Sequence, residues 1–155
     1  MSFNAKVLTV SDSVAAGTRD DRSGEVLAEL LTEHGFTVVD RATVADGAGN
    51  VAGALIELSA NFHGLVLTTG GTGFSPTDQT PEGTSRVLER HAPGLSEAMR
   101  AVNPLGRLSR GVAGTVGQTL VLNLPGSPNG ARENFDAVSD VIEHILDLLG
   151  GGQPH

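Results

Sequence analysis

Leu65-Val66-Leu67-Thr68-Thr69-Gly70-Gly71-Thr72-Gly73 is an apolar run that passes directly into three glycines within four positions. A short continuous apolar run is typical of a strand buried on both faces of a parallel sheet. The glycines allow a tight backbone turn that brings N–H groups close to an oxyanion. The stretch therefore predicts a buried strand followed by a ligand-binding loop. The loop matches neither the Walker A pattern nor the dinucleotide fingerprint, so a plain glycine-rich turn stays an alternative.

The alternation of apolar runs and amphipathic segments continues outward from this stretch in both directions. Strands are predicted at residues 7–10, 36–44, 65–68 and 119–124. Helical spacing predicts helices that carry Val26 to Leu31, Val51 to Leu58, Val87 and Leu88, Leu95 to Val102, and Phe135 to Leu149. Strands that alternate with helices are typical of an α/β fold with a mostly parallel central sheet. We expect one domain over residues 1–150 and a frayed tail over residues 151–155.

Two proline-containing segments have the form of a helix start. In Thr80-Pro81-Glu82, we expect the Thr80 hydroxyl to be the N-cap and Pro81 to be the first helical residue. Ser127-Pro128 has the same form, and its hydroxyl and helix N-terminus suit a phosphate as well as a cap. Each segment lies shortly after a predicted strand, and ligands in open α/β sheets bind at the carboxyl ends of strands.

Composition narrows the classes of function. The 155-residue chain carries a formal net charge of -8 and no cysteine, which argues against a general nucleic-acid surface and against thiolate chemistry. Its start does not have the form of a signal peptide, and no run approaches the roughly 20 apolar residues of a membrane span. We expect a cytoplasmic protein that binds neither nucleic acid nor membrane. The five histidines show no metal-ligand spacing.

Three acidic residues near the predicted strand ends are candidates for a role in the site. Asp78 lies five residues beyond the glycine loop and just before a helix start, where a carboxylate is electrostatically favourable. Asp46 follows the second strand, and Asp12 follows the first. Asp78 could merely cap or solvate the loop, but the glycine loop beside it favours a ligand for Mg²⁺ that arrives with a nucleotide triphosphate. An isolated Asp in a loop is usually solvated, so the position of Asp46 and Asp12 after predicted strands is the only reason to consider them.

Four motifs in this order resemble the MogA/MoaB family of molybdenum-cofactor proteins. They are Leu67-Thr68-Thr69-Gly70-Gly71-Thr72-Gly73, Asp78-Gln79-Thr80-Pro81-Glu82, Leu108-Ser109-Arg110 and Asn123-Leu124-Pro125-Gly126-Ser127-Pro128. Each motif alone is weakly specific, whereas the ordered set is highly specific and extends from the first strand to the last helix. One departure is Gly83, where the family more often has Ala, at a cost in helix propensity of roughly 1 kcal/mol.

The resemblance implies a three-layer α/β/α sandwich, typically a homotrimer, that binds molybdopterin and ATP. The implied reaction transfers AMP from MgATP to the terminal phosphate of molybdopterin and releases pyrophosphate. Asp78 and Asp46 match the acids that the family associates with catalysis and are the expected Mg²⁺ ligands. The positions that match ligand-binding loops are Ser11, Asp12, Gly70, Gly71, Thr72, Gly73, Pro125, Gly126, Ser127 and Pro128.

Other interpretations remain at this level. A non-catalytic molybdopterin carrier of the same fold would bind the pterin without ATP. The multidomain molybdenum-insertion proteins and the competence/damage-inducible family share the fold, usually with more chain. A molybdenum-insertion protein is the expected downstream partner. Arg110 is expected to contact either a phosphate or a neighbouring subunit of the trimer, and the sequence leaves both open.

Overall fold

The computed structural model describes residues 2–153, which form one six-stranded sheet in the order β2-β1-β3-β6-β5-β4. The strands are β1 (Asn4–Val10), β2 (Thr37–Val44), β3 (Gly64–Thr69), β4 (Arg90–His91), β5 (Ala113–Val116) and β6 (Thr119–Leu124). The first three strands and β6 pair in parallel, whereas β5 runs antiparallel to both of its neighbours. The prediction of a mostly parallel sheet is confirmed.

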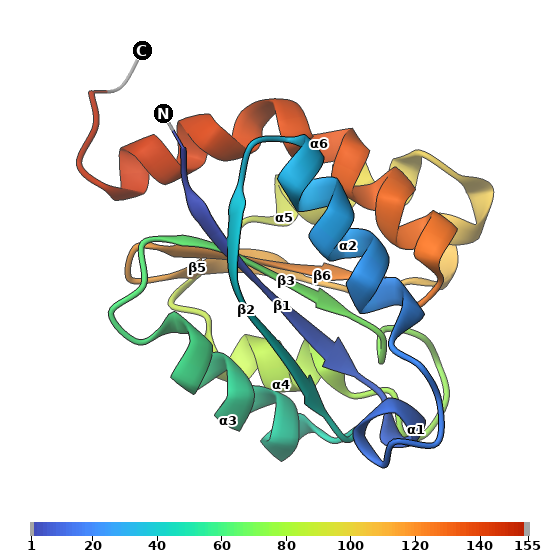
Figure 1. Ribbon diagram of the computed structural model, residues 1–155. Helices are drawn as coiled ribbons and strands as arrows, with labels where there is room; N and C mark the ends of the chain where they lie inside the picture. Colours follow the sequence, from blue (N-terminus) through green and yellow to red (C-terminus); the bar gives the residue numbers. More distant parts are fainter. Residues whose placement is uncertain (1, 154–155) are drawn as a thin grey trace.

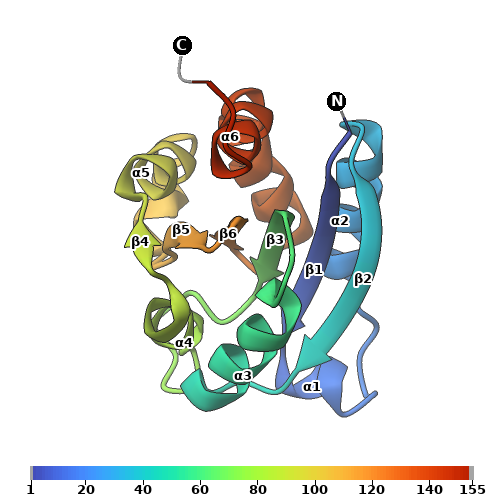
Figure 2. The same ribbon diagram turned by 90° about the vertical axis from the view of Figure 1, so that its left-hand side faces the viewer.

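Helices cover both faces of this sheet. They are α1 (Asp12–Ala15), α2 (Arg22–Glu33), α3 (Ala48–Ser59), α4 (Thr80–Val87), α5 (Pro93–Ala101), the 3₁₀ helix η1 (Pro104–Leu108) and α6 (Pro128–Leu149). Figures 1 and 2 show α2, α5 and α6 on one face and α3 and α4 on the other, which is the expected three-layer sandwich. None of the helices within residues 2–153 is long and apolar enough to span a membrane.

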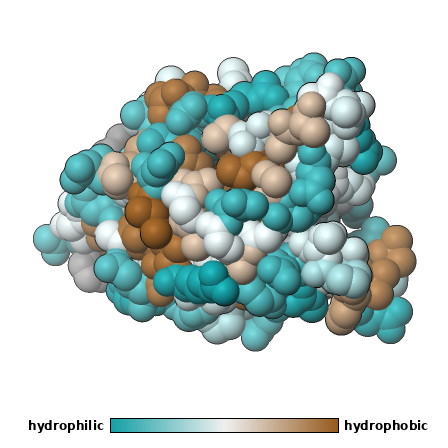
Figure 3. Space-filling view, turned by 90° about the horizontal axis from the view of Figure 1, so that it is seen from below, coloured by the Kyte–Doolittle hydropathy of each residue, from teal (hydrophilic) through white to brown (hydrophobic). Residues whose placement is uncertain are grey.

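The central strands are apolar on both faces because each face packs against helices. One cluster of buried side chains joins the sheet to α2, α5 and α6, and includes Leu67, Leu122 and Phe135. A smaller cluster joins it to α3 and α4 and includes Val66 and Leu55. Figure 3 shows the surface on the side of α3 and α4, where hydrophobic patches lie among hydrophilic residues. Burial on both faces explains why these strands have continuous apolar runs instead of alternation.

The parallel register brings three loops together at one edge of the sheet. Thr9 of β1 is level with Thr69 of β3, and Thr69 is level with Leu124 of β6. The N–H of Gly70 donates to the carbonyl of Leu124 at 3.2 Å, which ties the glycine loop to the loop after β6. Loops that follow β1, β3 and β6 therefore meet at the carboxyl ends of the strands, as expected for a ligand site in this fold.

Two local predictions about α4 need correction. Its N-cap is Gln79, which makes no side-chain capping bond, and Thr80 is the first helical residue. Gly83 does not merely lower helix propensity, because a Cβ at this position would lie 2.6 Å from the carbonyl oxygen of Ala48 and 2.7 Å from the Cβ of Val51. Glycine therefore permits the close approach of α4 to α3.

The sequence analysis did not predict α1, η1, β4 or β5, which are all short. Ser127 does cap α6 as predicted, since its Oγ accepts from the N–H of Gly130 at 3.1 Å. The predicted frayed tail begins after α6, and its residues 154–155 lie outside the described part of the chain.

Candidate functional site

The glycine loop depends on backbone conformations that favour glycine. Gly70 and Gly71 have φ values of 97° and 70°. A Cβ at Gly70 would collide with the carbonyl oxygen of Val10, and one at Gly71 would collide with the hydroxyl of Thr80. The loop is therefore pressed against the end of β1 on one side and against α4 on the other. Only glycine meets both the conformational and the steric requirement.

Thr80 holds this loop in place. Its Oγ1 donates to the carbonyl of Gly70 at 2.9 Å, and its N–H donates to the carbonyl of Gly71 at 3.0 Å. The side chain of Thr80 is fully buried. The hydroxyl that was expected to cap α4 instead fixes the turn before it. The carbonyls of the glycine loop are thereby turned toward the protein.

Several N–H groups at this edge remain available. Within residues 2–153, the N–H groups of Gly71, Thr72 and Gly73 donate to no protein acceptor. The same holds for the N–H groups of Gly126 and Ser127 at the start of α6. Successive free N–H groups in a turn and at a helix N-terminus form an anion-binding arrangement. The loop can therefore bind a phosphate group.

Three carboxylates lie beside this arrangement. The N–H of Asp12 donates to Oδ2 of Asp46 at 3.2 Å, and the N–H of Asp46 donates to Oδ1 of Asp12 at 2.9 Å. Burial raises the pKa of Asp46, the hydrogen bond from the Asp12 N–H opposes this, and the negative charges of Asp12 and Asp78 raise it further. A carboxyl crowded by like charges favours a cation nearby.

Asp78 approaches the glycine loop from the other side. Its Oδ2 accepts from the N–H of Ser75 at 3.0 Å, and its own N–H donates to the carbonyl of Ser75 at 2.9 Å. A Cβ at Gly73 would lie 2.9 Å from Oδ2 of Asp78. Within residues 2–153, no three Asp, Glu or His side chains form a preformed metal site. Asp46 and Asp78 can therefore supply only part of a metal's ligands.

Two cavities open on either side of these residues. The first has a volume of about 590 Å³ and lies between the glycine loop, η1 and the start of α6. The second has a volume of about 560 Å³ and lies between the glycine loop, β1 and the segment before α2. Four residues line both cavities: Gly71, Asp78, Gly126 and Ser127. The cavities therefore meet where the free N–H groups and the carboxylate of Asp78 are found.

The predicted site residues divide between the cavities. Thr72 and Pro125 line the first cavity, which also contains Asn103, Glu133 and Asn134. The second cavity is lined by four other predicted residues, which are Ser11, Asp46, Gly70 and Pro128. Asp12 lines neither cavity and acts on the site through its reciprocal contacts with Asp46. All of the predicted residues thus lie in one region.

Arg110 lines neither cavity, and its side-chain donors are bound to protein groups. Its Nε donates to the carbonyl of Gly73 and its Nη2 to the carbonyl of Asp78, both at 2.7 Å. Its Nη1 and Nη2 donate to the carboxylate of Glu82 at 2.7 and 3.3 Å. The hydrogen bond from Arg110 holds the pKa of Glu82 below its ordinary value of 4.5. The same bond raises the pKa of Arg110.

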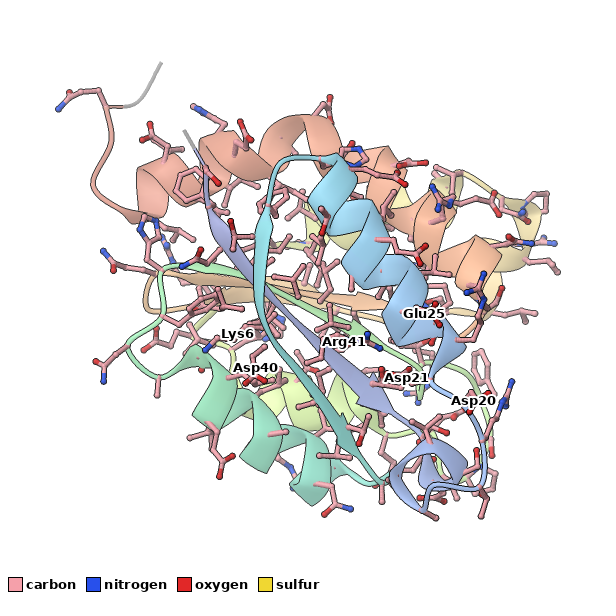
Figure 4. All side chains as sticks on the ribbon, viewed as in Figure 1. Lys6, Asp20, Asp21, Glu25, Asp40 and Arg41 are labelled. Carbon is pink, nitrogen blue, oxygen red and sulfur yellow. The ribbon has the colours of Figure 1, made fainter. Side chains whose placement is uncertain are left out.

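A second arginine–carboxylate pair lies at the wall of the second cavity. Asp21 caps α2 by accepting from the N–H of Gly24 at 3.0 Å, and it accepts from the hydroxyl of Thr9 at 2.9 and 3.0 Å. Arg41 of the edge strand β2 donates to Asp21 at 3.2 Å. Figure 4 shows Arg41 and Asp21 side by side between β2 and the start of α2.

Sequence reasoning did not find Asp21, Asn103 or Asn134. Asp21 could have been identified as an N-cap, because an acid precedes the apolar helical pattern by a few residues. Asn134 is buried, with 9% of its surface exposed, and it faces a cavity. An Asn in the first turns of an amphipathic helix carries no comparable signal, because the cavity depends on how η1 packs against α6.

Comparison with known proteins agrees with this geometry. The sequence profile of the family described as "Probable molybdopterin binding domain" matches residues 6–144. A molybdopterin adenylyltransferase of Helicobacter pylori (strain J99) is 36% identical over 152 residues, which cover 94% of this chain and 86% of the relative.

Solved structures give the same result. The molybdopterin biosynthesis enzyme MoaB from Thermus thermophilus has a TM-score of 0.90 at 43% identity, and 98% of each chain is covered. The molybdopterin biosynthesis Mog protein from Mycobacterium ulcerans has a TM-score of 0.87 at 43% identity, with 95% of this chain and 99% of that chain covered. The chain therefore belongs to the molybdopterin-binding-domain family that includes the MogA and MoaB proteins.

Proposed function

We propose that the chain is a molybdopterin adenylyltransferase, which transfers AMP from MgATP to the terminal phosphate of molybdopterin and releases pyrophosphate. Similarity to adenylyltransferases over nearly the whole chain supports this activity. One structural observation carries the proposal: two cavities of comparable size meet at Gly71, Asp78, Gly126 and Ser127. A reaction that joins two large substrates needs two binding spaces whose reacting ends meet.

The first cavity is proposed to bind the pterin. Asn103, Glu133 and Asn134 line it, and together they offer amide donors, amide acceptors and a carboxylate. A pterin ring presents donors and acceptors along one edge, and a mostly buried polar side chain such as Asn134 can recognise such an edge. Leu105 and Leu108 of η1 line the same cavity and offer apolar contact for the ring face.

The second cavity is proposed to bind the nucleotide. Arg19 and Arg22 line it, together with Ser11 and the glycine loop. Arginine and free backbone N–H groups are suited to bind a polyphosphate in a protein whose net charge is otherwise negative. The phosphates of ATP would then extend toward the junction, where the terminal phosphate of molybdopterin arrives from the first cavity.

Mg²⁺ fits the acidic side of the junction. The pKa of Asp46 is raised by burial and by the charges of Asp12 and Asp78, so a cation would relieve this repulsion. Asp46 and Asp78 are the proposed ligands, and phosphate oxygens and water would complete the coordination shell. When bound, Mg²⁺ neutralises charge on the phosphates and on the leaving pyrophosphate.

The chemistry requires no protein nucleophile. An oxygen of the molybdopterin phosphate, already an anion at pH 7, forms a bond to the α-phosphorus of ATP. The bond from that phosphorus to the bridging oxygen breaks, and pyrophosphate carries away the electron pair. The protein contributes alignment and charge stabilisation through the free N–H groups of Gly71, Thr72 and Gly73 and the start of α6.

A turnover assay tests the proposal directly. Purified protein is incubated with molybdopterin, ATP and Mg²⁺, and adenylated molybdopterin and pyrophosphate are quantified. We expect both products in equal amounts, and none after Mg²⁺ is chelated. Tight binding of molybdopterin without binding or consumption of ATP would instead identify a carrier. Binding of neither ligand would refute both functions.

Three further properties belong to this proposal. The protein acts in the cytoplasm, where its substrate ATP is found. It forms a homotrimer, which is supported by the strong exposure of Leu105 and Leu108 on η1, at 71% and 60%. Sedimentation velocity would test the trimer, and a monomeric mass would refute it.

The product passes to a metal-insertion protein, because an adenylated pterin is an activated intermediate that another reaction must consume.

A further inference from the structure

We propose that Arg110 and Glu82 are positioning residues, which clamp the 73–78 loop so that the carboxylate of Asp78 faces the junction of the two cavities. This inference rests on the proposed function, since it concerns the carboxylate that is assigned to Mg²⁺. It gives Arg110 a role other than the two that the sequence left open, a phosphate contact and a subunit contact.

The 73–78 loop is closed by one guanidinium. Nε of Arg110 binds the carbonyl at one end of the loop, on Gly73, and Nη2 binds the carbonyl at the other end, on Asp78. The main-chain N–H of Arg110 also donates to the carbonyl of Thr72 at 2.8 Å. Arg110 therefore fixes the distance between the two ends of the 73–78 loop. It also fixes the position of this loop against the glycine loop.

Glu82 orients this clamp from the first turn of α4. Its two carboxylate oxygens accept from Nη1 and Nη2 of Arg110. Such a two-point contact fixes the plane of the guanidinium, which a point charge cannot do. Arg110 directs four hydrogen bonds at protein acceptors, and a guanidinium has only five N–H donors. Little donor capacity remains for a phosphate.

The loop has little other support. Phe74, Ser75, Pro76 and Thr77 are all exposed, and the Phe74 ring itself lies over the guanidinium, with its centroid 5.7 Å from Cζ of Arg110. Inside the loop, the contacts between Ser75 and Asp78 determine where the Asp78 carboxylate points. Loss of the clamp would thus release the carboxylate without removing it, while the buried core stays unchanged.

The test measures ATP affinity by calorimetry, with and without Mg²⁺, in wild type, Arg110→Lys and Glu82→Gln. Lysine keeps the charge but cannot span both carbonyls. We expect Arg110→Lys to weaken MgATP binding about tenfold, because loss of a residue that orients a metal ligand typically weakens metal binding by this order, and we expect Glu82→Gln to weaken it less. Binding of metal-free ATP should change by less than about twofold in either variant, because neither residue is assigned to a phosphate.

The matched control is Arg86→Lys, an exposed arginine of α4 that lines neither cavity. It should bind both forms of ATP as wild type does. An equal loss of metal-free and MgATP binding in Arg110→Lys would make Arg110 a direct phosphate contact and overturn the proposal. Unchanged binding of both forms would overturn it as well. In Asp78→Asn, adding Arg110→Lys should cause no further loss of MgATP affinity, because both act through one carboxylate.

A second measurement is independent of any ligand. Amide hydrogen exchange should be faster in residues 73–78 of Arg110→Lys and Glu82→Gln, while exchange in the sheet stays as in wild type. Unchanged exchange of the loop in Glu82→Gln, the variant less disruptive to folding, refutes the clamp. If the loop is released as expected but wild type shows no Mg²⁺-dependent ATP binding, the proposed function fails and with it the role assigned to the clamp.

Discussion

The two walls of the site are each held by an arginine–carboxylate pair, and the two pairs are built in opposite ways. Beside the first cavity, Arg110 binds the loop that carries Asp78 and makes most of the contacts, whereas Glu82 only orients it. In the wall of the second cavity, Asp21 makes most of the contacts, to Thr9 and Gly24, and Arg41 is added from the surface.

The difference follows from which hydrogen-bonding groups need a partner in each wall. The 73–78 loop has a carbonyl at each end that needs a hydrogen-bond donor, so one side chain with several N–H groups is required, which is an arginine. The start of α2 presents a free N–H beside a buried hydroxyl, so it needs an acceptor, which is a carboxylate. The residue that satisfies the backbone should matter most, and its charged partner should matter much less.

The largest expected effect concerns the carboxylate that the first wall presents. Asp78→Asn keeps the shape of the side chain but removes the charge assigned to Mg²⁺. We expect turnover to fall by on the order of 10²–10³-fold, in line with the loss of one electrostatic contact to a reacting phosphate. Molybdopterin affinity, measured by fluorescence titration, should remain largely intact. Wild-type turnover in this variant would remove Asp78 from the mechanism, and the exposed Asp136→Asn on α6 serves as control.

Asp21→Ala should cause the larger loss of stability in the second wall. The change removes the cap of α2 and leaves the Thr9 hydroxyl, which is buried, without its acceptor. We expect the free energy of unfolding, measured by urea denaturation, to fall by about 2 kcal/mol. The neighbouring Asp20→Ala is the matched control, because the side chain of Asp20 makes no hydrogen bond within residues 2–153. Equal losses in the two variants would show that the contacts of Asp21 contribute nothing.

The parts of the site also differ in how well the sequence predicts them. The glycine loop, Asp46, Asp78 and Ser127 could be found because strand ends in a parallel sheet meet at one edge, and their residue types suit phosphate and metal. The fold class follows from the same pattern of apolar runs. By contrast, the direction in which Arg110 reaches depends on η1 and on β5, two short elements without a clear sequence pattern.

Thr80 illustrates the same limit within a single residue. Its position before Pro81 correctly marked the start of α4, since local chain geometry determines a helix start. Its hydroxyl was assigned to the wrong partner, because the glycine loop supplies a carbonyl from ten residues upstream, at Gly70. Contacts between segments that are brought together by the fold are beyond what local patterns predict.

Arg41→Ala tests the weaker member of the second pair. Arg41 lies on an edge strand with 41% of its side chain exposed. Water can therefore replace most of the interaction with Asp21 that the substitution removes. We expect a change of about 0.5 kcal/mol or less in the free energy of unfolding, as for other surface ion pairs. A loss as large as that of Asp21→Ala would mean that Arg41, and not the cap, holds this wall, and would break the contrast between the two pairs.

The smallest effect concerns Glu82 and depends on pH. Arg110 lowers the pKa of Glu82 in the folded state below its ordinary value of 4.5. The ionised carboxylate therefore stabilises the fold fully above the unfolded-state pKa, and this stabilisation is lost as pH falls through the lower folded-state pKa. Glu82→Gln should unfold at lower urea concentration than wild type at pH 7, and the difference should shrink below pH 4.5. Since 49% of the Glu82 side chain is exposed, the difference at pH 7 should be small and should decrease further with added salt. A difference that grows as the pH falls would contradict an ionised Glu82 as the partner of Arg110.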